Sequence, residues 1–382
     1  EITTRLVGSE MCIRDSQWFG FGSSDDYTSA FGNNFDGYTV IKDSQEYALS
    51  FGGELTDETL QQIVSDYQQM EADGMEEELE KTDWQIVNSW LGTLYPELRD
   101  TSNYKTMISY VDPDKLTGFY ERRQQVLDEF LEISGQVGAE KEFLHQMERK
   151  VEKPFHYEWI EGWSTLLGSM VADLGVVMAL FLGIVLSSLF AGEWHDNTST
   201  LVLTTRNGWG KIALAKILTG FAFTVELFAL LAVSSIISQL FFMGTAGWDM
   251  PIQNIKLIAV APMNMLQAEI YEYAFVLLGA IGFAGIVMFI SAAVKNNVLT
   301  LLLSLAVVYG PMMIAEYLPY EMQKALDLIP LVGSSTDIFR TNTFRIFGKL
   351  IWSPYLLITI PVLIGILCMP FAIKSWSRRM KA

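Results

Sequence analysis

Residues 164–190 read STLLGSMVADLGVVMALFLGIVLSSLF, an apolar stretch of 27 residues in which Asp173 carries the one charge. As an α-helix rising about 1.5 Å per residue it would be about 40 Å long, more than the roughly 30 Å of hydrocarbon in a bilayer. Tyr157, Trp159 and Trp163 stand just before it, and aromatic side chains of this kind favour the headgroup layer. The stretch therefore predicts a membrane-spanning helix.

Four further apolar stretches follow, each long enough to cross a bilayer: about 217–242, 272–293, 298–318 and 352–373. Five in succession make a soluble protein a poor interpretation. In lipid every backbone N–H and C=O must be bonded, and no alternation typical of a barrel strand is seen, so the spans are predicted to be helices. The fold class expected is an all-α polytopic membrane protein, with residues 161–382 as its transmembrane domain.

Charge is divided unevenly between the two halves of the chain. Residues 1–160 hold 13 Lys and Arg against 32 Asp and Glu, a net charge of −19, whereas residues 161–382 hold 13 against 12, a net charge of +1. Strong charge of one sign keeps a domain hydrated, and an acidic domain does not attract nucleic acid. Residues 17–160 are therefore expected to form an acidic domain in water.

This acidic domain is expected to be mainly helical. Thr56, followed by two acidic residues, predicts a helix N-terminus. Apolar residues with helical spacing predict further helices over 86–94 and, with a break at two glycines, over 120–147. Alternating apolar and polar residues over 38–51 predict one small hairpin.

The first 16 residues differ from the rest of this domain. Residues 7–16, VGSEMCIRDS, resemble translated sequencing adapter, and neither an initiator Met nor a signal-peptide pattern is present. We therefore expect residues 1–16 to be an artefactual tail that replaces a genuine N-terminal segment; a short native polar tail is the alternative.

Basic residues between the spans predict the orientation of the chain in the cell membrane. By parity, eight face one side and five face the other; the eight are Arg206, Lys211, Lys216, Lys295, Lys374, Arg378, Arg379 and Lys381, and the five are Lys256, Lys324, Arg340, Arg345 and Lys349. The positive-inside bias then places the C-terminus in the cytoplasm and residues 17–160 outside the cell. Five spans would leave that domain without an inserted helix ahead of it, so six are expected in the intact protein.

Residues that could carry catalysis or bind a metal are scarce. The three histidines do not share metal-ligand spacing, and the positions of Cys12 and Cys368 exclude a disulfide framework. Residues 205–212, TRNGWGKI, lack both the first Gly and the final Ser or Thr of a phosphate-binding loop. No catalytic residue, metal site or cofactor site is predicted in this chain.

The most informative segment lies between the first two spans. Residues 190–206 read FAGEWHDNTSTLVLTTR. Asn197 or Thr198 can cap a short helix whose Leu201 and Leu203 would otherwise be exposed to water. Such a helix needs a partner groove; an amphipathic loop at the membrane surface is the alternative.

This segment resembles the cytoplasmic loop of type-2 ABC exporter permeases. The resemblance is carried by an aromatic and an acidic residue at the end of a span, a capping pair, two leucines, an arginine and a lysine opening the next span: Phe190, Glu193, Asn197, Thr198, Leu201, Leu203, Arg206 and Lys216. It departs at Asn197, where Gly is commoner, and at Thr205, where Pro often precedes the Arg. The resemblance implies that this segment, Lys211 included, couples the permease to an ABC ATPase subunit. It implies that ATP and Mg²⁺ are held by that subunit, and that permease subunits pair as homo- or heterodimers.

Two acidic residues interrupt the apolar stretches. A carboxylate within lipid costs stability unless it is paired or hydrated, so Asp173 and Glu226 are candidates for an intramembrane pathway. A neutral carboxyl bonded to a neighbouring helix is the alternative, as is a dimer seam for Glu226. Gly279, Gly282 and Gly285 predict a close approach between helices.

The function expected is the export of a substrate, driven by ATP hydrolysis on a separate subunit, so the chain is not itself an enzyme. The main alternative is a membrane-anchored sensor or immunity protein that binds a peptide through its external domain without transport. A proton-driven secondary transporter using Asp173 and Glu226 is a third reading. Peptide, lipid-linked and drug-like substrates are all compatible with the sequence.

Overall fold

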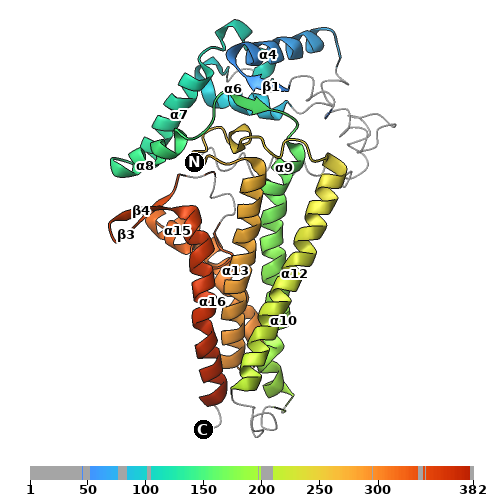
Figure 1. Ribbon diagram of the computed structural model, residues 1–382, viewed down its shortest axis with the longest axis vertical. Coiled ribbons are helices and arrows are strands. Elements are labelled where there is room, and N and C mark those ends of the chain that lie inside the picture. The colour runs from blue at the N-terminus through green and yellow to red at the C-terminus, as the bar shows by residue number, and fades with distance from the viewer. Residues whose placement is uncertain are drawn as a thin grey trace. The chain divides into compact units, whose positions relative to one another are not determined.

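The structure is a computed structural model of the 382-residue chain (Figure 1). The residues it describes are Gln45, 52–75, 84–100, 105–196, Thr198, 210–294, 296–333, Phe339 and 341–378. The chain divides into two compact units. The first unit holds Glu1–Thr165 and Ser238–Gln267, and the second unit holds Leu166–Ile237 and Ala268–Ala382.

Five helices among the described residues are long and apolar enough to cross a membrane, as a multi-pass membrane protein requires. The first consists of α9 (Glu161–Thr165), a π-helical turn (Leu166–Met170) and α10 (Val171–His195). The others are α12 (Lys211–Met243), α13 (Met265–Ala293), α14 (Asn297–Ile314) and α16 (Ser353–Arg378). The five predicted spans are confirmed as helices, although α13 begins seven residues earlier than predicted.

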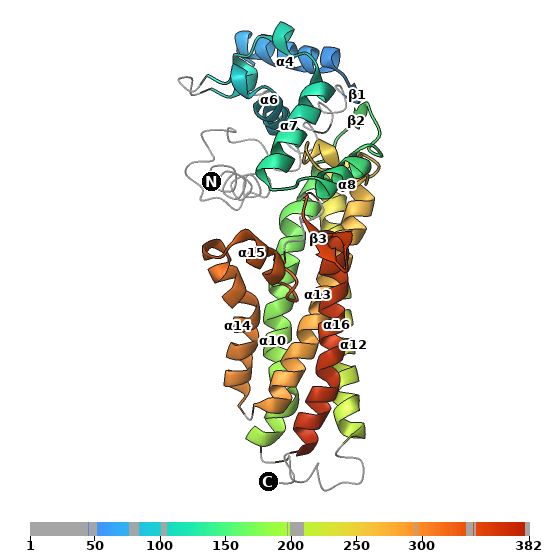
Figure 2. The ribbon, with the colours of Figure 1, turned by 90° about the vertical axis from the view of Figure 1, so that its left-hand side faces the viewer.

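Helix α13 is the most enclosed helix of the second unit. In the most apolar part of α13, 61% of the residues are buried, whereas the corresponding share is 17% in α12 and in α14. Figures 1 and 2 show α10, α12, α13 and α16 running side by side, and Figure 2 shows α14 alongside α10. Because the helices are apolar on every side, packing between them depends on van der Waals contact and on a few polar bonds.

Glycines bring the backbones of α13 and α16 together. A Cβ atom added at Gly285 would lie 2.6 Å from the Cα atom of Gly365, and one added at Gly282 would collide with the carbonyl oxygen of Pro361. No side chain fits between backbones this close, so the predicted close approach of helices at these glycines is confirmed.

Short elements connect α14 to α16: a 3-10 turn (Ala315–Tyr317), α15 (Tyr320–Leu326), β3 (Thr343–Ile346) and β4 (Lys349–Trp352). The two strands pair as an antiparallel hairpin. Phe347 and Gly348 form its turn with φ values of 49° and 79°, and positive φ at both positions matches the twist of the flanking strands. The sequence analysis predicted no strands here.

The first unit contains α4 (Asp57–Ala72), α6 (Gln85–Leu94), α7 (Phe119–Ile133) and α8 (Ala139–Glu148), with 3-10 turns at Pro96–Leu98, Met107–Ser109 and Pro113–Lys115. The predicted helices are confirmed. Thr56 caps α4, because its Oγ1 accepts a hydrogen bond of 3.2 Å from the backbone N–H of Thr59. The predicted hairpin over 38–51 lies outside the described residues apart from Gln45, and the predicted tail over 1–16 lies wholly outside them.

An apolar core holds α4, α6 and α7 together, and Leu144 of α8 packs in a second cluster with Leu127 and Leu131 of α7. The largest side chains of the first core include Trp90, Tyr95, Phe119 and Phe155, all fully buried. Two strands that are far apart in the sequence, β1 (Gly53–Leu55) and β2 (Phe155–Tyr157), pair antiparallel. The pairing joins the start of the described domain to its end.

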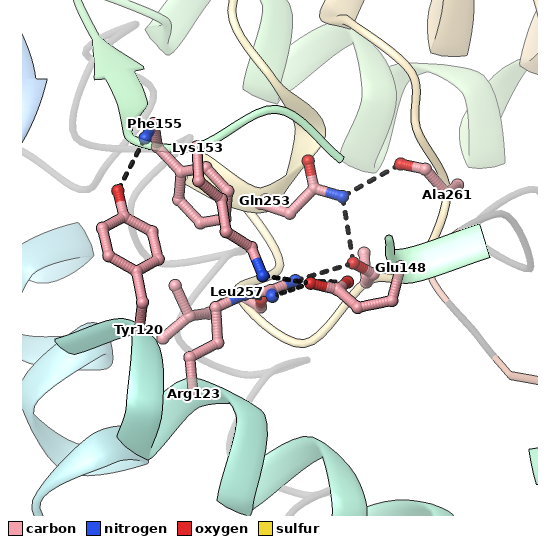
Figure 3. A network of polar contacts seen from close by, with 9 residues as sticks. Tyr120, Arg123, Glu148, Lys153, Phe155, Gln253, Leu257 and Ala261 are labelled. Atoms are coloured by element: carbon pink, nitrogen blue, oxygen red, sulfur yellow. Dashed lines mark hydrogen bonds and ion pairs between the residues drawn. The ribbon is translucent and has the colours of Figure 1, made fainter. Parts of the chain in front are cut away.

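A buried ion pair reinforces the first unit (Figure 3). The guanidinium of Arg123 on α7 donates to both carboxylate oxygens of Glu148 on α8, and Nζ of Lys153 lies 3.0 Å from Oε1 of Glu148. Arg123 also donates to the carbonyl oxygens of Leu257 (2.6 Å) and Ala259 (3.1 Å). The network therefore ties the two helices to the segment between α12 and α13.

The segment between α12 and α13 is packed into the first unit through hydrogen bonds. Trp90 Nε1 donates to the carbonyl oxygen of Asn254 at 3.2 Å, and Asn254 Nδ2 donates to the carbonyl oxygen of His156 at 2.8 Å. The amide of Gln253 donates to the carbonyl oxygens of Ala259 and Ala261, both at 2.9 Å. A connection between two spans thus contributes to the packing of the acidic domain.

Candidate functional site

The segment singled out in the sequence leaves and re-enters one end of the second unit. We call this the basal end, formed by residues 187–196, 210–217, 291–298 and 374–378. It contains the last turns of α10, α13 and α16 and the first turns of α12 and α14. The lower part of Figures 1 and 2 shows these ends gathered together.

An ion pair joins α10 to α12 at the basal end. Nζ of Lys216 lies 2.5 Å from Oε1 of Glu193 and donates a second hydrogen bond, of 2.6 Å, to the carbonyl oxygen of Leu189. The two side chains are only 17% and 20% exposed. Partial burial removes much of the screening by water, so this pair is stronger than one on an open surface.

Aromatic rings surround the ammonium group of Lys216. Its Nζ lies 5.2 Å from the ring centre of Phe190 and 5.5 Å from that of Trp376 on α16. Trp376 in turn packs against Phe190 and Trp194, with ring centres 5.5 Å and 6.1 Å apart. Cation–π attraction adds to the ion pair, and three helices meet around one charge.

Two serines fasten the same helices through hydrogen bonds. Ser291 Oγ on α13 accepts from the backbone N–H groups of Phe190 and Ala191, at 3.0 and 3.1 Å, and donates to the carbonyl oxygen of Ser187 at 2.7 Å. Ser375 Oγ on α16 donates to the carbonyl oxygen of Ala292 at 3.2 Å. The basal end is therefore a cross-linked junction of α10, α12, α13 and α16.

The chain turns immediately after α10. The backbone N–H of Thr198 donates to the carbonyl oxygen of Glu193 at 3.0 Å, and its hydroxyl approaches the same oxygen at 3.4 Å. Thr198 thus closes the C-terminal turn of α10, in addition to any capping of a following helix. Glu193 is held by both its backbone and its side chain.

Comparison of the chain with protein-family models, curated proteins and solved structures finds no match in any of the three. The geometry of the basal end is therefore interpreted from its own residues.

The structure brings together part of the predicted coupling segment. Glu193, Thr198 and Lys216 lie at one junction, whereas Lys211 is exposed at the first residue of α12. The remaining predicted residues lie outside the described residues: Asn197, Leu201, Leu203 and Arg206. Sequence reasoning missed Trp376 and Ser291, which come from distant helices and belong to no local motif.

One carboxylate oxygen at this junction is unsatisfied. Oε2 of Glu193 is buried and has no hydrogen-bond partner within the described part of the chain, and the same holds for Oδ1 of Asn297. Buried acceptors without donors destabilise the state in which they occur. These two oxygens therefore lower the stability of the junction in this conformation.

The acidic residues of the spans fall into two groups. Asp173 on α10 and Glu226 on α12 are both exposed on the faces of their helices, whereas Glu269 and Glu272 on α13 are buried. Sequence reasoning singled out neither residue, because Glu269 falls in the predicted loop before the third span and Glu272 is the first residue of that predicted span, 272–293. The available signal was the pair Glu269 and Glu272, spaced for one helical face, directly before an apolar run.

No metal centre is formed by the described residues, since none of their groups of His, Cys, Asp and Glu brings three potential ligands together.

Proposed function

We propose that this chain is the transmembrane permease subunit of an ATP-driven ABC exporter, which couples ATP hydrolysis on a separate subunit to outward movement of a substrate. The observation that carries the proposal is the ion pair between Glu193 and Lys216. This pair joins the end of α10 to the start of α12, and the segment that resembles a coupling loop connects these two helices.

Coupling needs a stiff connection between the docking segment and the spans. The segment between Thr198 and Gly210 begins at α10 and ends at α12, and the junction of Glu193, Lys216 and Trp376 links these helices to α16. A push on the segment by an ATPase subunit is then transmitted to several spans together. The cross-linked basal end supports this role.

The chemistry of hydrolysis belongs to the partner. ATP and Mg²⁺ are bound by the ABC ATPase subunit, and this chain contributes no catalytic residue. Two permease subunits, identical or related, form the conduit, and each docks one ATPase subunit through its segment over residues 197–210.

The orientation proposed is a cytoplasmic basal end in the plasma membrane. The excess of basic residues in the segments at this end supports it. The acidic domain then lies outside the cell, where it receives or releases the substrate. Hydrogen bonds from Asn254 and to Leu257 make the external connection between α12 and α13 part of that domain.

Association with an ATPase tests the proposal directly. We expect the chain to co-purify with an ABC ATPase subunit from its source cells and to raise the ATPase activity of that subunit. Replacing both Leu201 and Leu203 with Asp should abolish co-purification, because the short apolar helix would lose its fit to the partner groove. Met322→Asp on α15, at the far end of α14 from the basal end, is the matched control, since Met322 is also exposed.

Membrane insertion and the elution volume of the purified chain should be unchanged in these variants. Normal co-purification of the leucine variant would contradict the coupling segment. Failure of the unmodified chain to bind any ATPase would contradict the exporter and favour a peptide-binding sensor. Labelling of a cysteine placed at Ser199 by an impermeant reagent outside intact cells would contradict the orientation.

A further inference from the structure

Two buried carboxyl groups lie on one face of α13. Glu269 and Glu272 are three residues apart, so their side chains project from the same side of the helix. Glu269 is 4% exposed and Glu272 is fully buried. They differ in this from Asp173 and Glu226, which are exposed on the faces of their helices.

Neither carboxyl group has a counter-charge among the described residues, and the one polar group that interacts with Glu269 is the hydroxyl of Tyr273. All four side-chain oxygens are buried, and none forms a well-directed hydrogen bond within the described part of the chain. Beside them on the same helix, Tyr273 shares a hydrogen bond of 2.8 Å with Ser235 of α12. The ring of Tyr273 is also packed edge-on against Phe228, with ring centres 6.1 Å apart. The pair therefore lies where α12 and α13 contact each other, next to a hydroxyl pair and an aromatic ring.

Such a pair is unstable as two bare anions. Charged groups in apolar surroundings need a counter-charge, and two like charges on adjacent turns repel each other. Protons alone would remove the charge but not the deficit of hydrogen bonds. A buried carboxylic acid still has an O–H donor and an acceptor oxygen, and each needs a partner.

A cation that carries several N–H groups meets both needs. It supplies the opposite charge and also donates charge-assisted hydrogen bonds to carboxylate oxygens. We propose that Glu269 and Glu272 together bind the ammonium or guanidinium group of a ligand, with the hydroxyls of Tyr273 and Ser235 beside it.

The position along the helix suits a ligand that arrives from water. Helix α13 has 29 residues and is about 43 Å long at about 1.5 Å per residue, which exceeds the hydrocarbon thickness. Glu269 and Glu272 are its fifth and eighth residues, so they lie near the membrane boundary at the end opposite the basal end. A ligand that arrives from water at that end would therefore have to pass no more than about the first two turns of α13.

In the exporter this site selects substrates that bear an amine or a guanidinium. That role rests on the proposed function, whereas binding by the chain alone does not. A failure of ATPase association would therefore leave the binding result standing, and the reverse also holds.

Binding is tested with the purified full chain in detergent, with benzylammonium chloride as the probe and benzyl alcohol as its neutral analogue, at matched ionic strength. We expect benzylammonium to raise the melting temperature of the unmodified chain, and benzyl alcohol to leave it unchanged or lower it. The double variant E269Q/E272Q should bind benzylammonium at least tenfold more weakly. Glu226→Gln, which alters an exposed carboxylate, is the matched control and should bind as the unmodified chain does.

A second measurement needs no variant. Dicyclohexylcarbodiimide reacts with carboxyl groups in apolar surroundings, and mass spectrometry of peptides locates the adduct. Benzylammonium should protect Glu269 and Glu272 from the reagent without protecting Glu226. Equal binding of benzylammonium and benzyl alcohol, unchanged binding by the double variant, or absence of protection would each overturn the proposal.

Discussion

Lys216 and Glu193 form an ion pair with a separation of 2.5 Å between Nζ and Oε1, and this pair connects the first turns of α12 to the last turn of α10. Glu193 precedes the segment over residues 197–210, and Lys216 follows it. Because both side chains are largely buried, the contact fixes the distance between α10 and α12 at the basal end, where the proposed ATPase subunit docks.

Removing the ammonium group should destabilise the second unit. Lys216→Met leaves the carboxylate of Glu193 partly buried without its counter-charge, and we expect the free energy of unfolding to fall by about 1–3 kcal/mol. Lys211→Met is the matched control, because Lys211 is exposed at the same end of α12, and its effect should be below about 0.5 kcal/mol. Thermal unfolding of the purified chain measures both, and equal effects would contradict the structural role of the pair.

The same pair can be tested by a double-mutant cycle. E193Q/K216M removes both charges. Its loss of unfolding free energy should therefore be smaller, by about 1–2 kcal/mol, than the sum of the losses caused by the two single substitutions. Strict additivity would mean that the two groups do not interact.

Replacing glycine with alanine should lower stability at the contact between α13 and α16 but not at an open position of α10. Gly285→Ala introduces a Cβ atom 2.6 Å from Gly365 Cα, so the helices must separate, at a cost of about 1–3 kcal/mol. Gly175→Ala in α10 meets no atom within 4 Å and should be neutral or stabilising by up to about 1 kcal/mol, because Ala favours helix. Melting temperatures of the two variants should move apart, and a shared decrease would argue against close packing at Gly285.

The buried network of the first unit predicts a large effect at Glu148. Glu148→Gln leaves Arg123, which is fully buried, without a carboxylate, and should lower the free energy of unfolding by about 3 kcal/mol. Glu142→Gln alters an exposed pair with Arg149 at 3.3 Å and should change it by less than about 0.5 kcal/mol. Urea unfolding followed by tryptophan fluorescence measures the stability of the chain, and proteolysis near Leu257, which reports the first unit, should increase only in the Glu148 variant.

Tyr120 predicts a pH dependence in the same unit. Its hydroxyl donates to the carbonyl oxygen of Leu55 at 2.8 Å and accepts from the backbone N–H of Phe155 at 2.6 Å, and burial raises its pKa to about 12. The raised pKa means that the folded state holds this proton more tightly than the unfolded state. The stabilisation is therefore complete below pH 10 and is lost as the pH rises from 10 to 12.

In Tyr120→Phe the phenolic proton is absent, so unfolding free energy should fall less steeply between pH 10 and 12 than in the unmodified chain. At pH 7 the variant should be less stable by about 1–3 kcal/mol, because the N–H of Phe155 loses its acceptor. Urea unfolding at a series of pH values measures both effects. Parallel pH profiles of the two proteins would show that Tyr120 does not cause the loss.

Local features were predictable because they depend on residues close in sequence. The cap at Thr56 and the break between α7 and α8 follow from side-chain type and glycine, and the structure confirms both. The pairing of β1 with β2 was not predictable, since three-residue strands about 100 residues apart carry no shared local signal. The β3–β4 hairpin was missed because its turn places Phe347, rather than the usual Asn or Gly, at positive φ.

The candidate sites divide in the same way. Glu193, Thr198 and Lys216 were found through a local segment, whereas Trp376 contacts Lys216 from a helix 160 residues later. Asp173 and Glu226 were chosen because they interrupt apolar runs, yet both are exposed on their helices. Glu269, which falls in the predicted loop, and Glu272, which is the first residue of the predicted third span, are both buried on α13.

By itself the sequence determined that five helices are apolar enough for lipid and that an acidic, hydrated domain is joined to them, because hydropathy and charge are properties of composition along the chain. Only the tertiary structure decided which face of each span is enclosed. A helix that is apolar all round has no amphipathic stripe to show where its neighbours lie, so the burial of Glu272, the exposure of Glu226 and the junction at Lys216 follow from how the helices pack.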